Sequence, residues 1–189
     1  MRLGIFGGTF NPIHWGHLVL AESAREQLRL DRVLFIPAHR PPHKSAQGLL
    51  PGSVRLKLVQ LAIKDHPAFV ASDIELQREG VSYSIETVRM LKRELPTATL
   101  FLLLGADMLS VRWLAWDALK RLCTIALVQR PGAAPRREAG LRWLRMPPIG
   151  ISSSEVRARL QSGRSIRYLV PPAMERSLYH YRLSGQVHP

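Results

Sequence analysis

Two histidines after a glycine-rich turn are the residues of this sequence best suited to chemistry on a phosphate. His14 and His17 stand three residues apart in the stretch GGTFNPIHWGH, residues 7–17. The apolar run 3–6 before it and the amphipathic segment 18–28 after it predict the order strand, turn, helix. Backbone N–H groups at such a helix start attract anions, and two imidazoles can donate hydrogen bonds to phosphate oxygens. The stretch therefore predicts a site that handles a nucleotide.

Two common phosphate-binding motifs do not fit this stretch. The glycines fall at Gly4, Gly7 and Gly8, which does not match G-x-G-x-x-G, and the chain lacks the Gly-Lys-Ser/Thr ending of a Walker loop. What remains is H-x-G-H, in which Gly16 lets a ligand approach the helix start closely. The alternative is a tight turn with two unrelated histidines, one capping the helix and one on the surface. The surrounding strand, glycine pair and helix favour the nucleotide site.

Short apolar runs alternate with helical patterns along the chain. The runs that predict strands are 3–6, 33–37, 69–72, 100–104 and 124–128. Apolar stripes at helical spacing are Val54, Leu58, Leu61 and Ala62, and Ile85, Val88, Leu91 and Leu95. This alternation predicts an α/β fold with a doubly wound parallel sheet, in which ligands bind beyond the carboxyl ends of the strands. The loops after the first and fourth strands should therefore meet in one cleft.

The least regular parts of the chain are the proline- and glycine-rich stretches 38–52 and 131–150. We expect both to be loops, and the second to form a mobile rim of the site. A chain of 189 residues predicts one domain, residues 1–189, with a C-terminal helical part from about residue 151.

The cysteine content and the chain start bear on the compartment. Cys123 is the single cysteine, so no intramolecular disulfide can form, which fits a reducing compartment. The first residues lack the pattern of a signal peptide, and no apolar run approaches the length of a membrane span. We expect a cytoplasmic protein that does not bind a membrane.

Positive charge is concentrated in the last third of the chain. The formal net charge is +13, and residues 130–189 carry eleven arginines against three glutamates. A field of this sign attracts polyanions, which suits a nucleoside triphosphate and also suits nucleic acid. Charge alone does not separate these two partners, and we expect most individual arginines on solvated faces.

Five motifs together resemble one family. They are GGTFNPIHWGH, PPHK at 41–44, SYSIET at 82–87, GADML at 105–109 and ISSSEVR at 151–157. In order and approximate spacing they are similar to the bacterial nicotinate mononucleotide adenylyltransferases, members of the nucleotidyltransferase superfamily with the H-x-G-H motif. The resemblance covers nearly the whole chain and implies a Rossmann-like nucleotidyltransferase fold. It also implies that the chain condenses ATP with nicotinate mononucleotide to give deamido-NAD and pyrophosphate, in NAD biosynthesis.

The resemblance assigns the ATP phosphates to the first and last motifs. His14 and His17 are then the catalytic residues, with His17 nearer the α-phosphate in the transition state. Ser152 and Glu155 have the spacing of a capping box, and the same helix start with Arg157 can offer N–H groups, hydroxyls and a guanidinium to phosphates. The ATP site implied in this way consists of Gly7, Gly8, Thr9, Phe10, His14, His17, Gly105, Asp107, Ser152, Ser153 and Arg157.

The segments after the fourth and fifth strands supply further candidates. A carboxylate such as Asp107 at the end of a parallel strand can accept both hydroxyls of a ribose, and the resemblance assigns it to the adenosine side. The alternative is that Asp107 caps a helix. The resemblance assigns Trp113 to stack on the pyridine ring, and Trp116 is the alternative stacking residue. Arg130 is a weaker candidate for the nucleotide site.

The acceptor mononucleotide is assigned to two more motifs by the same resemblance. His43 and Lys44 follow two prolines that stiffen the loop, and the family pattern brings Lys44 to the phosphate of the mononucleotide. The alternative is an ordinary exposed lysine in a turn. Tyr83 and Ser84 stand beside the nicotinate ring, at a predicted helix start where capping is the alternative.

The resemblance implies ATP and nicotinate mononucleotide as partners, and we expect no specific nucleic acid. The sequence leaves open whether the chain forms a homo-oligomer. Mg²⁺ is expected to be carried by ATP, because magnesium keeps waters and substrate phosphates in its shell and no metal ligands are evident in the sequence. One alternative is another adenylyltransferase of the superfamily, with nicotinamide mononucleotide or phosphopantetheine as acceptor. The other is a basic nucleic-acid-binding module, which would release no pyrophosphate.

Overall fold

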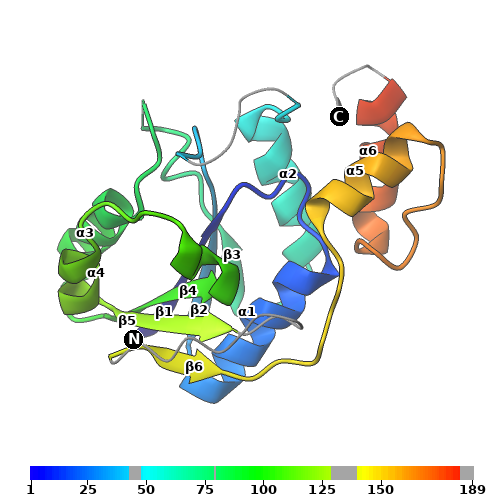
Figure 1. The fold of residues 1–189 in the computed structure, drawn as a ribbon. Coiled ribbons are helices and arrows are strands. Elements are labelled where there is room, and N and C mark those ends of the chain that lie inside the picture. The colour runs from blue at the N-terminus through cyan, green and yellow to red at the C-terminus, as the bar shows by residue number, and fades with distance from the viewer. Residues whose placement is uncertain (43–47, 79, 129–139, 184–189) are drawn as a thin grey trace.

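A sheet of six parallel strands forms the centre of the structure (Figure 1). The computed structural model describes residues 1–42, 48–78, 80–128 and 140–183. The strands are β1 (Arg2–Gly8), β2 (Arg32–Pro37), β3 (Phe69–Ala71), β4 (Thr99–Gly105), β5 (Thr124–Val128) and β6 (Arg142–Leu144). The helices are α1 (Trp15–Leu28), α2 (Gly52–Ile63), α3 (Ser84–Glu94), the short 3-10 helix η1 (Ala106–Ser110), α4 (Trp116–Leu122), α5 (Ser153–Gln161) and α6 (Pro172–Leu183).

The order of the strands is β3-β2-β1-β4-β5-β6, and each neighbouring pair is parallel. This is the order of a Rossmann-type sheet, so the predicted doubly wound α/β fold is confirmed. Five strands lie on the apolar runs that predict them. β6 lies in the stretch 131–150, for which the sequence predicts a loop, and that prediction is wrong for β6. Its three residues hold no apolar run, and only pairing with β5 makes them a strand.

Apolar layers cover both faces of the sheet. One layer packs α1, α2, α5 and α6 against strand residues such as Phe6 and Phe35. The other packs α3 and α4 against residues such as Ile5 and Leu102. Neighbouring strand residues such as Ile5 and Phe6 point to opposite faces, so a strand covered on both sides needs a continuous apolar run. This explains why the positions of β1 to β5 could be predicted from hydrophobicity alone.

The topology brings two of the predicted motifs to one edge of the sheet. β1 lies between β2 and β4. The connection after β1 therefore runs toward one side of the sheet, and the connection after β4 runs toward the other side. Gly8 ends β1 and Gly105 ends β4, at the same edge. Ligands of doubly wound sheets bind in the crevice at this kind of switch point.

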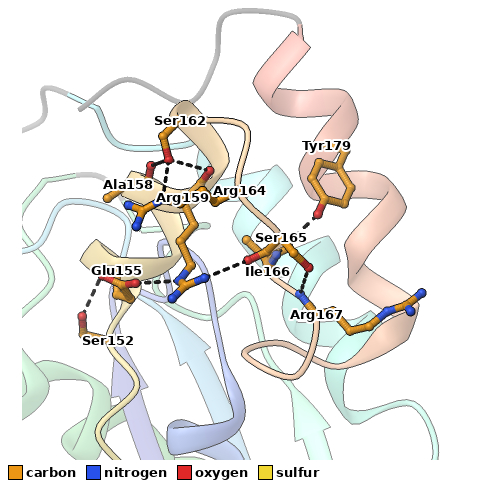
Figure 2. Close-up of polar contacts among 10 residues, drawn as sticks. All are labelled: Ser152, Glu155, Ala158, Arg159, Ser162, Arg164, Ser165, Ile166, Arg167 and Tyr179. Carbon is orange, nitrogen blue, oxygen red and sulfur yellow. Dashed lines mark hydrogen bonds and ion pairs between the residues drawn. The ribbon is translucent and has the colours of Figure 1, made fainter.

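The C-terminal helices α5 and α6 lie against each other, and α6 also packs against α2, at one end of the molecule (Figure 1). Val156 of α5 and Met174 of α6 are completely buried. The Tyr179 hydroxyl of α6 accepts the backbone N–H of Ile166 at 3.4 Å, which ties the chain after α5 to α6 (Figure 2). Within the described ranges, neither these helices nor the others are long and apolar enough to span a membrane.

Candidate active site

The loop that leaves β1 turns back onto the end of its own strand. Phe10 has a φ of 47°, in the left-handed region that side chains rarely adopt, and the residue is 1% exposed. A Cβ at Gly8 would lie 3.0 Å from the Phe10 ring, so glycine permits the turn. A Cβ at Gly7 would meet nothing within 4 Å, which shows that the strand end is open at this point.

The two histidines of H-x-G-H lie ring against ring at the start of α1. His14 is the N-cap residue and is 1% exposed, and its ring centroid lies 3.8 Å from that of His17. The backbone N–H of His14 donates to Nδ1 of His17 over 3.2 Å. Because Nδ1 accepts, a neutral His17 carries its proton on Nε2, which makes Nε2 a hydrogen-bond donor. A Cβ at Gly16 would lie 3.1 Å from the His14 ring, so the pair needs glycine between its members.

The start of α5 is bonded to the loop after β1. The Ser153 hydroxyl donates to the carbonyl of Pro12 at 2.9 Å, and the Arg157 guanidinium donates to the carbonyl of Asn11 at 2.8 Å. Burial lowers the pKa of Arg157 from its usual value. Ser152 caps α5 by accepting the N–H of Glu155 at 3.1 Å, as the capping-box spacing predicts (Figure 2). The last motif therefore holds the first motif in place.

Arg55 of α2 is a site residue that the sequence patterns did not reveal. It is 1% exposed, and it donates to the carbonyls of Leu50, Thr9 and His39 at 2.8, 2.9 and 3.4 Å. Burial lowers the pKa of its guanidinium to about 10. Its position within an apolar helix face, where a cation is costly, is the one signal that could have identified it.

The start of α3 and the segment after β4 face the same region. Tyr83 is the N-cap residue of α3 and Ser84 its first residue, and neither makes a side-chain cap bond, so the capping alternative is wrong. Asp107 does not cap a helix either, because the N-cap of η1 is Gly105, and its side chain is exposed. Trp113 precedes α4, and its indole N–H donates to the carbonyl of Met108 at 2.7 Å.

These segments enclose one cavity of about 360 Å³ at the switch point. That volume lies in the range of small-ligand sites. The predicted site residues that line it are Gly7, Gly8, Thr9, Phe10, His17, Tyr83, Ser84, Gly105, Asp107 and Trp113. The prediction that the loops after the first and fourth strands share one cleft is confirmed. Glu75 and Arg112 also line the cavity, and no motif pointed to them.

Other predicted residues lie away from the cavity wall. His14 lies behind His17, whereas Ser152, Ser153 and Arg157 contact or neighbour the loop after β1 instead of lining the cavity. Trp116 is the first residue of α4, and its ring centroid lies 5.3 Å from that of Trp113. His43, Lys44 and Arg130 lie outside the described residues.

A metal would find few protein ligands in the part of the chain that the structure describes. No group of three or more His, Cys, Asp or Glu side chains is arranged there to hold an ion. The carboxylates on the cavity wall are Asp107 and the buried Glu75. This donor set fits a cation that arrives with most of its ligands, as magnesium does on a nucleotide.

Comparison with known proteins assigns the family. Residues 5–159 match the model of the cytidylyltransferase-like family. The chain is 41% identical to a probable nicotinate-nucleotide adenylyltransferase of Shouchella clausii, with 97% of each chain covered. The chain belongs to the nicotinate-nucleotide adenylyltransferase family. A second relative of the same name, from Thermus thermophilus, is 45% identical over 93% of this chain and 95% of its own.

Solved structures agree with the adenylyltransferase fold. The nicotinic acid mononucleotide adenylyltransferase of Plasmodium falciparum complexed with NaAD has a TM-score of 0.78 at 18% identity, covering 98% of this chain and 96% of its own. A putative nicotinate-nucleotide adenylyltransferase from Vibrio parahaemolyticus has a TM-score of 0.70 at 20% identity, covering 98% and 94%. At such identities the likeness bears on the fold alone.

Proposed function

We propose that the cavity between the ends of β1 and β4 is where this adenylyltransferase joins ATP to nicotinate mononucleotide, within one domain that spans residues 1–189. The observation that carries the proposal is that four of the five motifs contribute residues to this one cavity, through Thr9, Pro41, Ser84 and Asp107 among others. The fifth motif is bonded to the first through Arg157. The relatives at 41 and 45% identity bear the name of this activity.

The reaction needs positioned donors and no protein nucleophile. A phosphate oxygen of nicotinate mononucleotide forms a bond to the α-phosphorus of ATP, and the bond from that phosphorus to the bridging oxygen of the β-phosphate breaks. Pyrophosphate leaves with the electron pair. The attacking phosphate monoester is already an anion near neutral pH, because its second pKa is about 6. The protein's task is to align the two phosphates and to stabilise the negative charge that develops.

We assign to His17 the stabilisation of the negative charge that develops on the transferring phosphate. His17 lines the cavity, and its Nδ1 is occupied by the N–H of His14, so its Nε2 is a donor for an oxygen of the transferring phosphate. His14 supports His17 from behind and fixes its tautomer. Ser152, Ser153 and Arg157 stand at a helix start beside the same loop, where the β- and γ-phosphates would find N–H groups and a cation.

The two substrates would occupy different parts of the wall. Asp107, exposed beyond the end of β4, is assigned to the ribose of ATP, because a carboxylate can accept both hydroxyls. Mg²⁺ bound to the ATP phosphates would neutralise part of their charge. Tyr83, Ser84 and Trp113 are assigned to the nicotinate ring. His43 and Lys44 remain the predicted contacts of the mononucleotide phosphate.

An acceptor panel tests this function. Pyrophosphate release is measured with ATP, Mg²⁺ and, in turn, nicotinate mononucleotide, nicotinamide mononucleotide and phosphopantetheine. The start of α3 offers N–H donors and partial positive charge, which favour a carboxylate over an amide that brings donors of its own. We expect kcat/KM to favour the nicotinate compound about 10² to 10³-fold. Equal values for the two pyridine compounds, or activity with phosphopantetheine alone, would contradict the proposal.

A further inference from the structure

Glu75 is a buried carboxylate on the cavity wall that the adenylyl transfer above does not use. Glu75 is 5% exposed and lies in the segment between β3 and α3. The Thr87 hydroxyl of α3 donates to its Oε1 at 2.6 Å, and Ser82 is a polar neighbour on the same cavity wall. Burying a carboxylate is costly unless its oxygens are bonded, and here a hydroxyl of α3 bonds one of them.

Thr87 and Ser82 each accept a hydrogen bond from an N–H donor. The guanidinium of Arg78 donates to the Thr87 hydroxyl oxygen at 3.3 Å. The backbone N–H of His39 donates to the Ser82 hydroxyl oxygen at 2.8 Å. Because the Thr87 oxygen already accepts a hydrogen bond, its proton is directed to the carboxylate. The chain of bonds from Arg78 through Thr87 therefore ends at Glu75.

This network joins the two segments that face the acceptor side of the cavity. His39 lies just beyond β2, in the loop that continues through Pro41 and Pro42 on the cavity wall, and the N–H of Ser82 also donates to the carbonyl of Arg40 at 2.9 Å. Ser82 is followed directly by Tyr83 and Ser84 at the start of α3. Ser82 thus joins the loop after β2 to the segment before α3, and the Glu75 carboxylate holds the first turn of α3 through Thr87.

We propose that Glu75 is a positioning residue for the acceptor mononucleotide, acting through Thr87 to hold the start of α3, with Ser82 beside it, in place on the cavity wall. The proposal rests on the proposed function for the identity of the acceptor. Glu75 does not touch the reacting phosphates in this assignment. Its loss should therefore weaken acceptor binding and leave the ATP side, which is built from other elements, unchanged.

Replacement of the carboxylate by its isosteric amide tests this role. In Glu75→Gln the NH₂ group replaces one oxygen, and the Thr87 hydroxyl keeps only an uncharged amide oxygen as its acceptor, which makes a weaker bond than a carboxylate. We expect the KM for nicotinate mononucleotide to rise about tenfold, while the KM for ATP stays within about twofold. Glu94→Gln, at the exposed end of α3, is the matched control and should leave both values unchanged. An unchanged acceptor KM, or an equal rise in both KM values, would overturn the proposal.

Two further variants keep the test decisive if Glu75→Gln does not fold. Thr87→Val and Ser82→Ala each remove one hydroxyl, and each should raise the acceptor KM in the same selective way. Where Glu75→Gln does fold, adding Thr87→Val should cost less than the two single effects combined, because both substitutions act on the same bond. Additive effects, or single variants with a normal acceptor KM, would count against the network.

A measurement without substrate separates this proposal from the assignment of the reaction. Hydrogen exchange of the backbone amides of His39 and Ser82 should become faster in Glu75→Gln, with no change in α1. Faster exchange together with no nicotinate mononucleotide activity in the wild type would contradict the function and leave the positioning role intact. Unchanged exchange at both amides would contradict the positioning role, whatever the acceptor is.

Discussion

The side of the cavity that is assigned to ATP and the side that is assigned to the acceptor, called the ATP side and the acceptor side below, are held in place in different ways. On the ATP side, the loop after β1 is bonded by residues distant in the sequence, and the Arg157–Asn11 bond spans 146 positions. On the acceptor side, the indole N–H of Trp113 reaches a carbonyl only five positions away, at Met108. There, Ser82 bonds the loop after β2, and Thr87 donates to the buried carboxylate of Glu75.

This difference matches the chemistry that each side is assigned. Donors that stabilise a developing charge are effective only if they are oriented before the reaction begins, so the start of α1 with His17 and the loop before it have to be fixed by the fold. Recognition of a ring needs contact area and a few polar groups, which local structure can supply. Substitutions on the ATP side should therefore act mainly on turnover, and those on the acceptor side mainly on KM.

The largest effect is expected at His17. His17→Ala should lower kcat about 10² to 10³-fold with little change in folding, because it removes one preorganised donor to the transferring phosphate. Steady-state kinetics and a thermal melt measure the two quantities. His180→Ala on the exposed face of α6 is the control. A near-normal kcat in a folded His17→Ala protein would contradict the assignment of His17 as a catalytic residue.

Arg157→Met should have the next largest effect. It deletes the bond to the carbonyl of Asn11, which releases the loop after β1 from α5, and it removes the cation that is assigned to the β- and γ-phosphates. We expect kcat to fall about 10 to 10²-fold, since small displacements of positioned groups are costly. Arg159→Met, which breaks an ion pair with Glu155 on the same helix, should leave kcat within about twofold (Figure 2). If both variants behave alike, the long-range bond is not what fixes the ATP side.

A smaller effect is expected at Asp107. Asp107→Ala should raise the KM for ATP about tenfold, the cost of a lost hydrogen bond to a charged acceptor. With 2′-deoxy-ATP the same substitution should cost less, because one of the ribose hydroxyls is already missing. An equal loss with both nucleotides would mean that Asp107 does not contact the ribose.

The smallest effect is expected at the tryptophans. Trp113→Leu should raise the KM for nicotinate mononucleotide about 3 to 10-fold, the worth of one aromatic stacking contact. Trp116→Leu is the matched variant and should leave that KM nearly unchanged, because Trp116 does not line the cavity. A larger rise for Trp116→Leu would reverse the assignment that the sequence leaves open.

The parts of the fold that could be predicted from the sequence are those with strong local signals. β1 to β5 are continuous apolar runs, and α5 begins with a serine whose capping spacing is visible in the sequence. β6 gave no such signal, since three residues become a strand only through their pairing with β5. Elements fixed by tertiary contact are missed by reasoning that sees one segment at a time.

The candidate site divides in the same way. His17, Asp107 and Ser84 belong to motifs that could be recognised, and the fold brings them to one cavity. Arg55 and Glu75 belong to none of these motifs, and the bonds that give them a role join segments that meet only in three dimensions. The sequence also suggested capping roles for Ser84 and Asp107, and these are wrong because the backbone starts each helix one or more residues earlier.

Arg55 has a thermodynamic consequence for the substrate-free protein. Among the described residues its bonds go to three carbonyls and no carboxylate forms an ion pair with it. A buried cation is therefore bonded to the backbone of Thr9, on the wall of the cavity that is assigned to the substrates. Desolvation of that cation weakens the unliganded fold, which its pKa of about 10 reflects. Anionic substrates bring the opposite charge, so occupancy and folding are linked. The protein should be most susceptible to heat when its substrates are exhausted.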